Sequence, residues 1–138
     1  KREVIWEDRT LTVESIPLKH KVPTCGFLFT ERHRDQVPRK RYAYCSDTAY
    51  REQIVEQIAG VDVLYHEATY TEKDVDKCKK HTHSTAKQAA NIARLAGVGK
   101  LVIGHFSARE DNHNVFLEEA KEVFENTVLA VERTTIEL

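Results

Sequence analysis

Apolar and polar positions in the first part of the chain follow the pattern of β-strands. Residues 3–7 and 10–16 cluster β-branched and apolar side chains on either side of a short polar turn, and residues 25–30 predict a further strand. The stretch 31–41 shows no apolar periodicity and contains a proline and five Arg or Lys residues, which is typical of a basic loop. The first part of the chain therefore predicts a hairpin, a third strand and a loop.

From residue 42 onward, apolar residues recur alternately at the spacing of strands and of helices. Strands are expected at residues 42–45, 61–65, 100–103 and 128–132, and helices at residues 50–59, 84–96 and 115–125. In the second helix, Ser84 is the expected N-cap, and a face of alanines favours close packing on a sheet. This order of elements predicts an α/β fold, in which a mixed sheet carries helices on at least one face.

The composition is that of one soluble globular domain, with 138 residues, 41% of them apolar and 31% charged. The net charge of −1 gives no sign of nucleic-acid binding, so a basic surface, if present, must be local. Three cysteines without a Cys-x-x-Cys pair argue for a reducing compartment, so we expect a cytoplasmic protein. No apolar run predicts a membrane helix or a signal peptide. The sequence begins with Lys1 and contains no methionine, so we expect a fragment.

Candidate metal ligands follow the predicted strands. Asp47, Glu67 and His105 each come at the end of a strand, and such side chains converge at one edge of an open α/β sheet. Zinc prefers imidazole nitrogen and carboxylate oxygen, so the candidate zinc ligands are His20, Asp47 and His105. The alternative is that each histidine is an ordinary hydrogen-bonded residue, which is the commoner role for a single histidine after a strand.

Short motifs carry a family resemblance across nearly the whole chain. They read Pro-Leu-Lys-His at 17–20, Tyr-Cys-Ser-Asp-Thr at 44–48, His-Glu-Ala-Thr at 66–69, and His-Ser-Thr at 83–85 paired with Gly-His-Phe-Ser at 104–107. In order and spacing these blocks resemble the ribonuclease Z family of metallo-β-lactamase enzymes. The resemblance implies the C-terminal half of the αββα sandwich of that fold, with helices on the outer face of a mixed sheet.

The resemblance also implies roles for individual residues. His20 would bind one zinc ion, His105 a second, and Asp47 would bridge both, with manganese or cobalt as possible substitutes. Glu67 would orient His83, which would protonate the departing ribose oxygen. The alternative for Glu67 and His83 is a purely structural role in orienting the ligands.

The implied reaction is removal of the 3′ trailer from precursor tRNA, which leaves a 3′ hydroxyl on the tRNA. The implied partners are precursor tRNA and, in the intact enzyme, a second subunit of a homodimer; we expect neither membrane nor DNA binding. Two alternatives remain. One is another phosphodiesterase of the same fold that shares His20, Asp47 and His105; the other is a non-catalytic half-domain that binds a partner through an exposed sheet edge and apolar face.

Two features depart from the family pattern. The His-x-His-x-Asp-His block of the family's N-terminal half is absent, so we expect this chain alone to bind zinc weakly and to cleave nothing. The loop 31–41 is shorter than the family's insertion, so a tRNA-gripping arm is either lost or omitted. Its basic run, Arg39 to Arg41, would either contact phosphates or form a solvated surface.

The other histidines and Cys45 have simpler expected roles. His66 is expected to pack or form hydrogen bonds without taking part in catalysis, and His33, His81 and His113 are expected to face solvent. Cys45 is expected to be a small buried apolar residue and not a reactive thiol.

Overall fold

The structure is a computed structural model that describes residues 2–32 and 39–138. The strands are β1 Val4–Glu7, β2 Leu11–Pro17, β3 Cys25–Glu31, β4 Arg41–Cys45, β5 Val63–Glu67, β6 Lys100–Gly104 and β7 Thr127–Leu129. The α-helices are α1 Val55–Ile58, α2 Val75–His81, α3 Ala86–Ala96 and α4 Asn114–Lys121, and 3₁₀ turns at Glu52–Ile54 and Glu72–Asp74 lead into α1 and α2. None of the described helices is long and apolar enough to cross a membrane.

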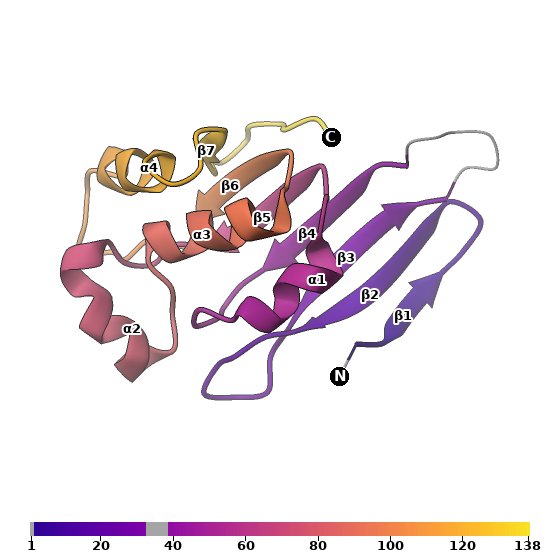
Figure 1. Ribbon diagram of the computed structural model, residues 1–138, viewed down its shortest axis with the longest axis horizontal. Coiled ribbons are helices and arrows are strands. Elements are labelled where there is room, and N and C mark those ends of the chain that lie inside the picture. The colour runs from indigo at the N-terminus through magenta and orange to yellow at the C-terminus, as the bar shows by residue number, and fades with distance from the viewer. Residues whose placement is uncertain (1, 33–38) are drawn as a thin grey trace.

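All seven strands form one sheet whose spatial order follows the chain from β1 to β7 (Figure 1). Strands β1 to β4 pair antiparallel through hairpin connections. Strands β4 to β7 pair parallel, because each connection between them crosses over one face of the sheet. The α/β class and the mixed sheet are confirmed.

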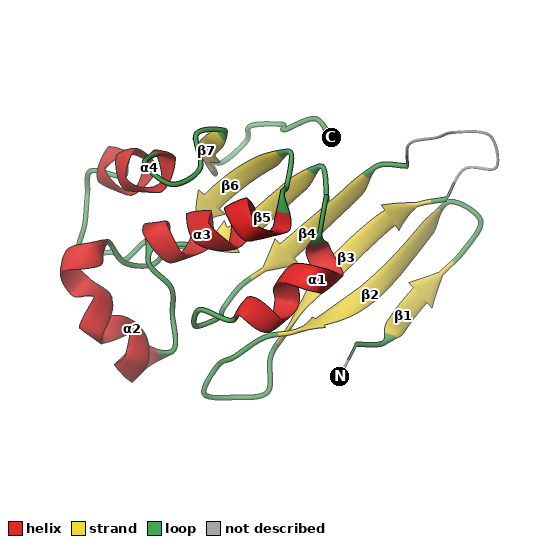
Figure 2. Ribbon diagram, viewed as in Figure 1, coloured by secondary structure: helices red, strands yellow, loops and turns green. Residues whose placement is uncertain are grey.

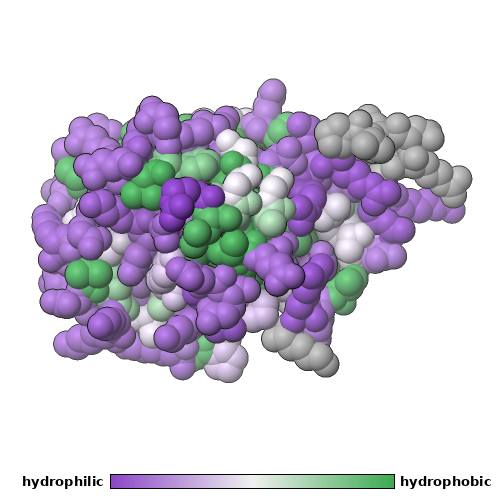
Figure 3. Space-filling view, viewed as in Figure 1, coloured by the Kyte–Doolittle hydropathy of each residue, from purple (hydrophilic) through white to green (hydrophobic). Residues whose placement is uncertain are grey.

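The helices α1 and α3 lie across the same face of the sheet, while α2 lies beyond the end of the parallel strands (Figure 2). Apolar side chains gather over α3, between α1 and α4, and hydrophilic side chains cover most of the rest of this face (Figure 3). The predicted face of alanines on α3 is buried, which allows the helix axis to approach the sheet closely. Helices on one side of the sheet are thus confirmed.

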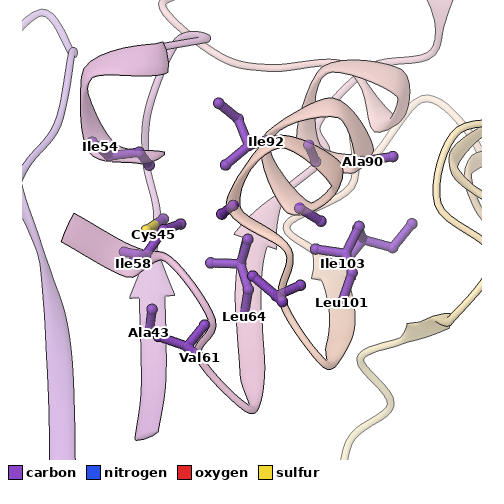
Figure 4. Packing of buried hydrophobic residues seen from close by; sticks show 14 of the residues in the cluster. Ala43, Cys45, Ile54, Ile58, Val61, Leu64, Ala90, Ile92, Leu101 and Ile103 are labelled. Atoms are coloured by element: carbon purple, nitrogen blue, oxygen red, sulfur yellow. The ribbon is translucent and has the colours of Figure 1, made fainter. Parts of the chain in front are cut away.

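The hydrophobic core fills the space between α1, α3 and the central strands (Figure 4). Ala43, Leu64 and Leu101 of neighbouring strands belong to one cluster with Ile58 and Ile92 of the helices, and all five side chains are buried. Truncation of one of the large aliphatic side chains to alanine in such a core costs about 2–5 kcal/mol. The core therefore fixes the parallel strands relative to one another.

The sheet face opposite the helices carries aromatic side chains. The rings of Phe29 and Tyr42 stack with their centroids 5.6 Å apart, and those of Tyr44 and Tyr65 stack at 4.8 Å. Burial of the hydroxyl raises the pKa of Tyr65 to about 12. At the edge of this sheet, Trp6 of β1 is 58% exposed. The aromatic side chains of this face are partly buried, and the β1 edge is exposed.

Several predicted boundaries differ from the structure. The predicted loop 31–41 is shorter, because Glu31 ends β3 and Arg41 begins β4; its central residues 33–38, including His33, lie outside the described part of the chain. The last strand is 127–129 and not 128–132, and helix α2 was not predicted.

The N-cap of α3 is Thr85 and not Ser84. The Thr85 hydroxyl accepts a hydrogen bond from the Gln88 amide, and the Gln88 side chain accepts one from the Thr85 amide, which forms a capping box. Ser84 has other partners, since its hydroxyl donates to the carbonyl of Thr48 and its amide to the Glu67 carboxylate.

Candidate metal centre

The parallel strands bring three candidate site residues to the same edge of the sheet. Cys45 of β4, His66 of β5 and Ile103 of β6 lie in register, so the residues that follow them leave the sheet side by side. Asp47, Glu67 and His105 therefore come together where the three strands end, as predicted. His83 joins them from the connection between α2 and α3.

Nitrogen and oxygen atoms of four side chains form the centre. One atom each from Asp47, Glu67, His83 and His105 lies within 4.8 Å of all the others. Nε2 of His105 lies 3.2 Å from Oδ1 of Asp47, and both side chains are partly open to solvent. Imidazole nitrogen and carboxylate oxygen are ligands that zinc accepts readily. The chemistry of this donor set therefore fits a zinc ion.

The Glu67 carboxylate is completely buried and surrounded by donors. Oε1 accepts hydrogen bonds from the Thr48 amide at 2.9 Å and from Nδ1 of His83 at 2.7 Å. Oε2 accepts from the Thr69 hydroxyl at 2.6 Å and from the amides of Ser84 and Thr69 at 3.1 and 3.3 Å. These bonds offset the large desolvation cost of a buried charge. Both oxygens of Glu67 are therefore already occupied by hydrogen bonds from the residues around it.

The hydroxyl of Thr69 links Glu67 to His105. Thr69 Oγ1 lies 2.6 Å from Glu67 Oε2 and 3.0 Å from His105 Nδ1. Its single proton goes to the carboxylate, which can only accept, so the hydroxyl must in turn accept from the N–H at Nδ1 of His105. This assignment leaves the lone pair of His105 on Nε2, the atom that faces Asp47. One buried carboxylate thus orients both imidazoles, His83 directly and His105 through Thr69.

His20 lies beside His83 and outside the group of four. Its ring is 5.4 Å from the ring of His83, and the His83 ring is 5.4 Å from that of His105. Nδ1 of His20 donates to the carbonyl of Thr82 at 3.0 Å, which leaves its Nε2 available. Of the three predicted metal ligands, the structure therefore brings Asp47 and His105 into one group and places His20 one imidazole away from it.

The backbone is strained at two positions of this region. Thr82 and His105 have φ angles of 56° and 61°, in the left-handed region that costs a non-glycine residue about 1–3 kcal/mol. Gly104 precedes His105, and a Cβ atom at this position would collide with the hydroxyl of Tyr65. Such strain is common at functional sites, where surrounding contacts hold it in place.

The side chains outside the centre agree with their expected roles. His66 is fully buried, its Nδ1 is bonded to the Glu67 carbonyl at 2.8 Å, and burial lowers its pKa, so the ring is neutral. His81 is partly exposed, and His113 is exposed while its ring lies 4.6 Å from that of Phe106. Cys45 is fully buried, and burial raises the pKa of its thiol to about 12, which makes it unreactive.

Comparison with known proteins agrees with the fold and the site. The model of the beta-lactamase superfamily domain matches residues 2–106. The chain belongs to the beta-lactamase superfamily. It has the metallo-β-lactamase fold, and its resemblance to ribonuclease Z is confirmed by the relatives described next.

The curated relatives include two bacterial proteins named ribonuclease Z. The protein from Bacteroides fragilis (strain YCH46) is 42% identical over 178 residues, which cover 98% of this chain and 59% of that protein. The protein from Azobacteroides pseudotrichonymphae is 46% identical over 157 residues, which cover 94% of this chain and 54% of that protein. This chain therefore spans between a half and two thirds of these relatives' length.

Among solved structures, the short form of human tRNase Z has a TM-score of 0.78 to this chain. It is 27% identical, and the match covers 99% of this chain and 46% of the human one.

Both bacterial alignments are longer than the 138 residues of this chain, so the relatives carry residues within the aligned stretch that this chain lacks.

Proposed function

We propose that this chain supplies part of the active site of a zinc-dependent endoribonuclease that removes the 3′ trailer from precursor tRNA. The observation that supports this most strongly is the pair formed by buried Glu67 and partly exposed His83, 2.7 Å apart, next to the Asp47–His105 pair, 3.2 Å apart. The first pair offers a proton donor and the second a ligand set, and cleavage of a phosphodiester whose leaving group is a ribose oxygen calls for both. The name of the two bacterial relatives, ribonuclease Z, is that of a nuclease, which supports this proposal.

Asp47 and His105 would hold zinc, and His20 would contribute a ligand to a second ion. Bound zinc supplies a water of lowered pKa and neutralises charge on the phosphodiester. The chain's own contribution is to fix the ligands before an ion arrives. Thr69 holds the ring of His105, and the Thr82 carbonyl holds that of His20, so each ring presents Nε2.

His83 would act as the general acid. Its Nδ1 is held by Glu67, so Nε2 is the atom left to carry a proton toward the substrate. Proton transfer from Nε2 to the departing 3′ oxygen of the tRNA leaves the 3′ hydroxyl of the product. Glu67 keeps the ring in this orientation and stays out of the proton transfer itself.

A second candidate is another phosphodiesterase of the same fold, since the Asp47–His105 pair alone would serve any metal-dependent hydrolase. The Glu67–His83 pair favours the ribonuclease, because a poor leaving group such as a ribose oxygen needs protonation. Hydrolysis of bis(p-nitrophenyl) phosphate, whose leaving group needs no proton, tests this. In the full-length protein, His83→Ala should abolish precursor tRNA cleavage and largely spare the small substrate; equal loss of both would contradict the role of His83.

The metal assignment is tested with Asp47→Ala in the full-length protein. We expect the variant to lose bound zinc, measured by metal analysis, together with cleavage of precursor tRNA. A variant that keeps both would place the metal site elsewhere. The cytoplasmic location, the homodimer and the inactivity of this chain in isolation stay predictions.

A further inference from the structure

Five exposed cations around the candidate centre have no acidic partner among the described residues. Away from the centre, ion pairs form between Arg2 and Glu14, Arg32 and Glu7, Lys40 and Asp62, Lys87 and Glu122, and Lys121 and Glu125. Within the described residues, Lys19, Lys21, Lys79, Lys80 and Arg109 make no such pair, and all are exposed. Other unpaired cations, such as Arg9 and Lys100, lie in separate segments.

The unpaired cations come from three segments that meet at His83. The loop after β2, which carries Lys21, is joined to the end of α2 by the hydrogen bond from His20 to Thr82. The end of α2 carries Lys80. The loop after β6, which carries Arg109, is held by the Ser107 amide, which donates to the carbonyl of Thr69 at 2.9 Å. The fold therefore gathers cations that are far apart in the sequence.

The surroundings of His81 agree with this gathering. Partial burial lowers the pKa of His81, and the positive charges of Lys21, Lys80 and Arg109 lower it further. All three charges therefore act on one side chain two residues from His83. Like charges held close together without acidic partners repel one another, and this repulsion is relieved when an anion binds between them.

A cleft of about 410 Å³ runs beside these cations, between α2 and the loop after β6. Thr69, the residue that holds His105, lies in its wall, so the cleft leads away from the candidate centre. Lys73 and Lys77 also line it but are paired with Glu110 at 3.6 Å and Asp74 at 3.2 Å. Arg109 is the lining cation that has no described acidic partner.

In the basic run at the end of the predicted loop, Lys40 and Arg41 contact other parts of the fold. The guanidinium of Arg41 donates to the carbonyls of Ala59 and Gln57, and the ammonium of Lys40 lies 4.0 Å from Asp62. These cations hold the start of β4 in place. The structure therefore favours the end of the sheet near His83 over this run as a surface for phosphates.

We propose that Lys21, Lys80 and Arg109 form a surface that binds the phosphodiester backbone of RNA next to the bond that is cleaved. The inference rests on the proposed function, because it assigns part of the substrate to residues beside that site. It also explains how a chain with a net charge of −1 can bind a polyanion, since these three cations come from segments that meet beside the candidate centre. Such contacts position the RNA backbone and carry no sequence preference.

The test measures binding of precursor tRNA by the full-length protein at several salt concentrations. Every protein compared in this binding test, including the parent, carries His83→Ala, which should prevent cleavage during the measurement. Each lost phosphate contact lowers the slope of log affinity against log salt by about 1. Replacing Lys21, Lys80 and Arg109 together with alanine should therefore lower the slope by about 2 to 3.

A matched variant replaces Arg9, Lys100 and Lys121 with alanine, which removes the same charge from other parts of the surface. Its slope should stay within about 1 of the parent. An unchanged slope in the first variant, or equal losses in both, would overturn the proposed surface.

Hydrolysis of bis(p-nitrophenyl) phosphate, with His83 intact, should be the same in both surface variants and the parent. If the His83→Ala protein binds precursor tRNA with the expected slopes but the protein with His83 intact does not cleave it, the proposed function fails and the surface stands. If the parent does not bind precursor tRNA, both fail.

Discussion

The hydroxyl of Thr69 offers the sharpest test of how the centre is organised. Thr69→Val keeps the size of the side chain but removes the bonds to Glu67 at 2.6 Å and to His105 at 3.0 Å. Loss of a hydrogen bond to a buried charged group costs about 1.5–3 kcal/mol of stability. Loss of the partner that orients a metal-binding histidine typically weakens metal binding by about 10- to 100-fold. We therefore expect Thr69→Val to show both effects in the full-length protein.

Zinc affinity is measured by competition with a chelator, and stability by thermal unfolding of the metal-free protein. Thr69→Ser restores the hydroxyl and should bind zinc nearly as well as the parent. Thr127→Val is the matched control, because Thr127 is also buried and its hydroxyl donates to the Phe124 carbonyl at 2.6 Å, at the other end of β6. It should lose stability and keep its zinc affinity. If Thr69→Val binds zinc like the parent, the hydroxyl does not hold His105 in place and the reasoning fails.

Three further predictions follow from the same contacts. Glu67→Gln places an amide NH₂ among the donors that now surround the carboxylate, so it should lower both the unfolding temperature and precursor tRNA cleavage. Gly104→Ala should destabilise the protein because the new Cβ meets the Tyr65 hydroxyl, and Tyr65→Phe in the same chain should recover part of the loss in thermal unfolding. A thiol reagent near neutral pH should label exposed Cys25 in the folded protein and spare Cys45, whose pKa is raised to about 12, until the protein unfolds; mass spectrometry locates the label.

The convergence of Asp47, Glu67 and His105 could be predicted from the sequence because it depends only on the order of strands and helices. Parallel strands joined by crossovers end at the same edge of a sheet, so a residue directly after each strand must approach the others. The distance from His83 to Glu67 could not be obtained in this way. It depends on α2, a short helix with two cationic residues near its end and a single buried side chain, Cys78, which leaves no apolar stripe to recognise.

The cap of α3 is a case in which the sequence held a signal that was not used. Ser84 and Thr85 are both good N-cap residues, but only Thr85 is followed three residues later by Gln, the spacing of a capping box. The role of Ser84 depends on tertiary contacts with Glu67 and Thr48, which no local pattern reports. The position of His20 is also tertiary, since its partner Thr82 is 62 residues away in the chain.

The buried Glu67 couples two parts of the centre that could otherwise vary independently. His83 is bonded to one of its oxygens, and His105 reaches the other through Thr69. A change that moves the carboxylate must therefore disturb the candidate proton donor and the candidate metal ligand together. Removal of the Thr69 hydroxyl should disturb only the candidate metal ligand, His105. Comparing Glu67→Gln with Thr69→Val in the full-length protein thus separates loss of the proton donor from loss of metal. When zinc is supplied in large excess, only Glu67→Gln should remain defective in cleavage of precursor tRNA.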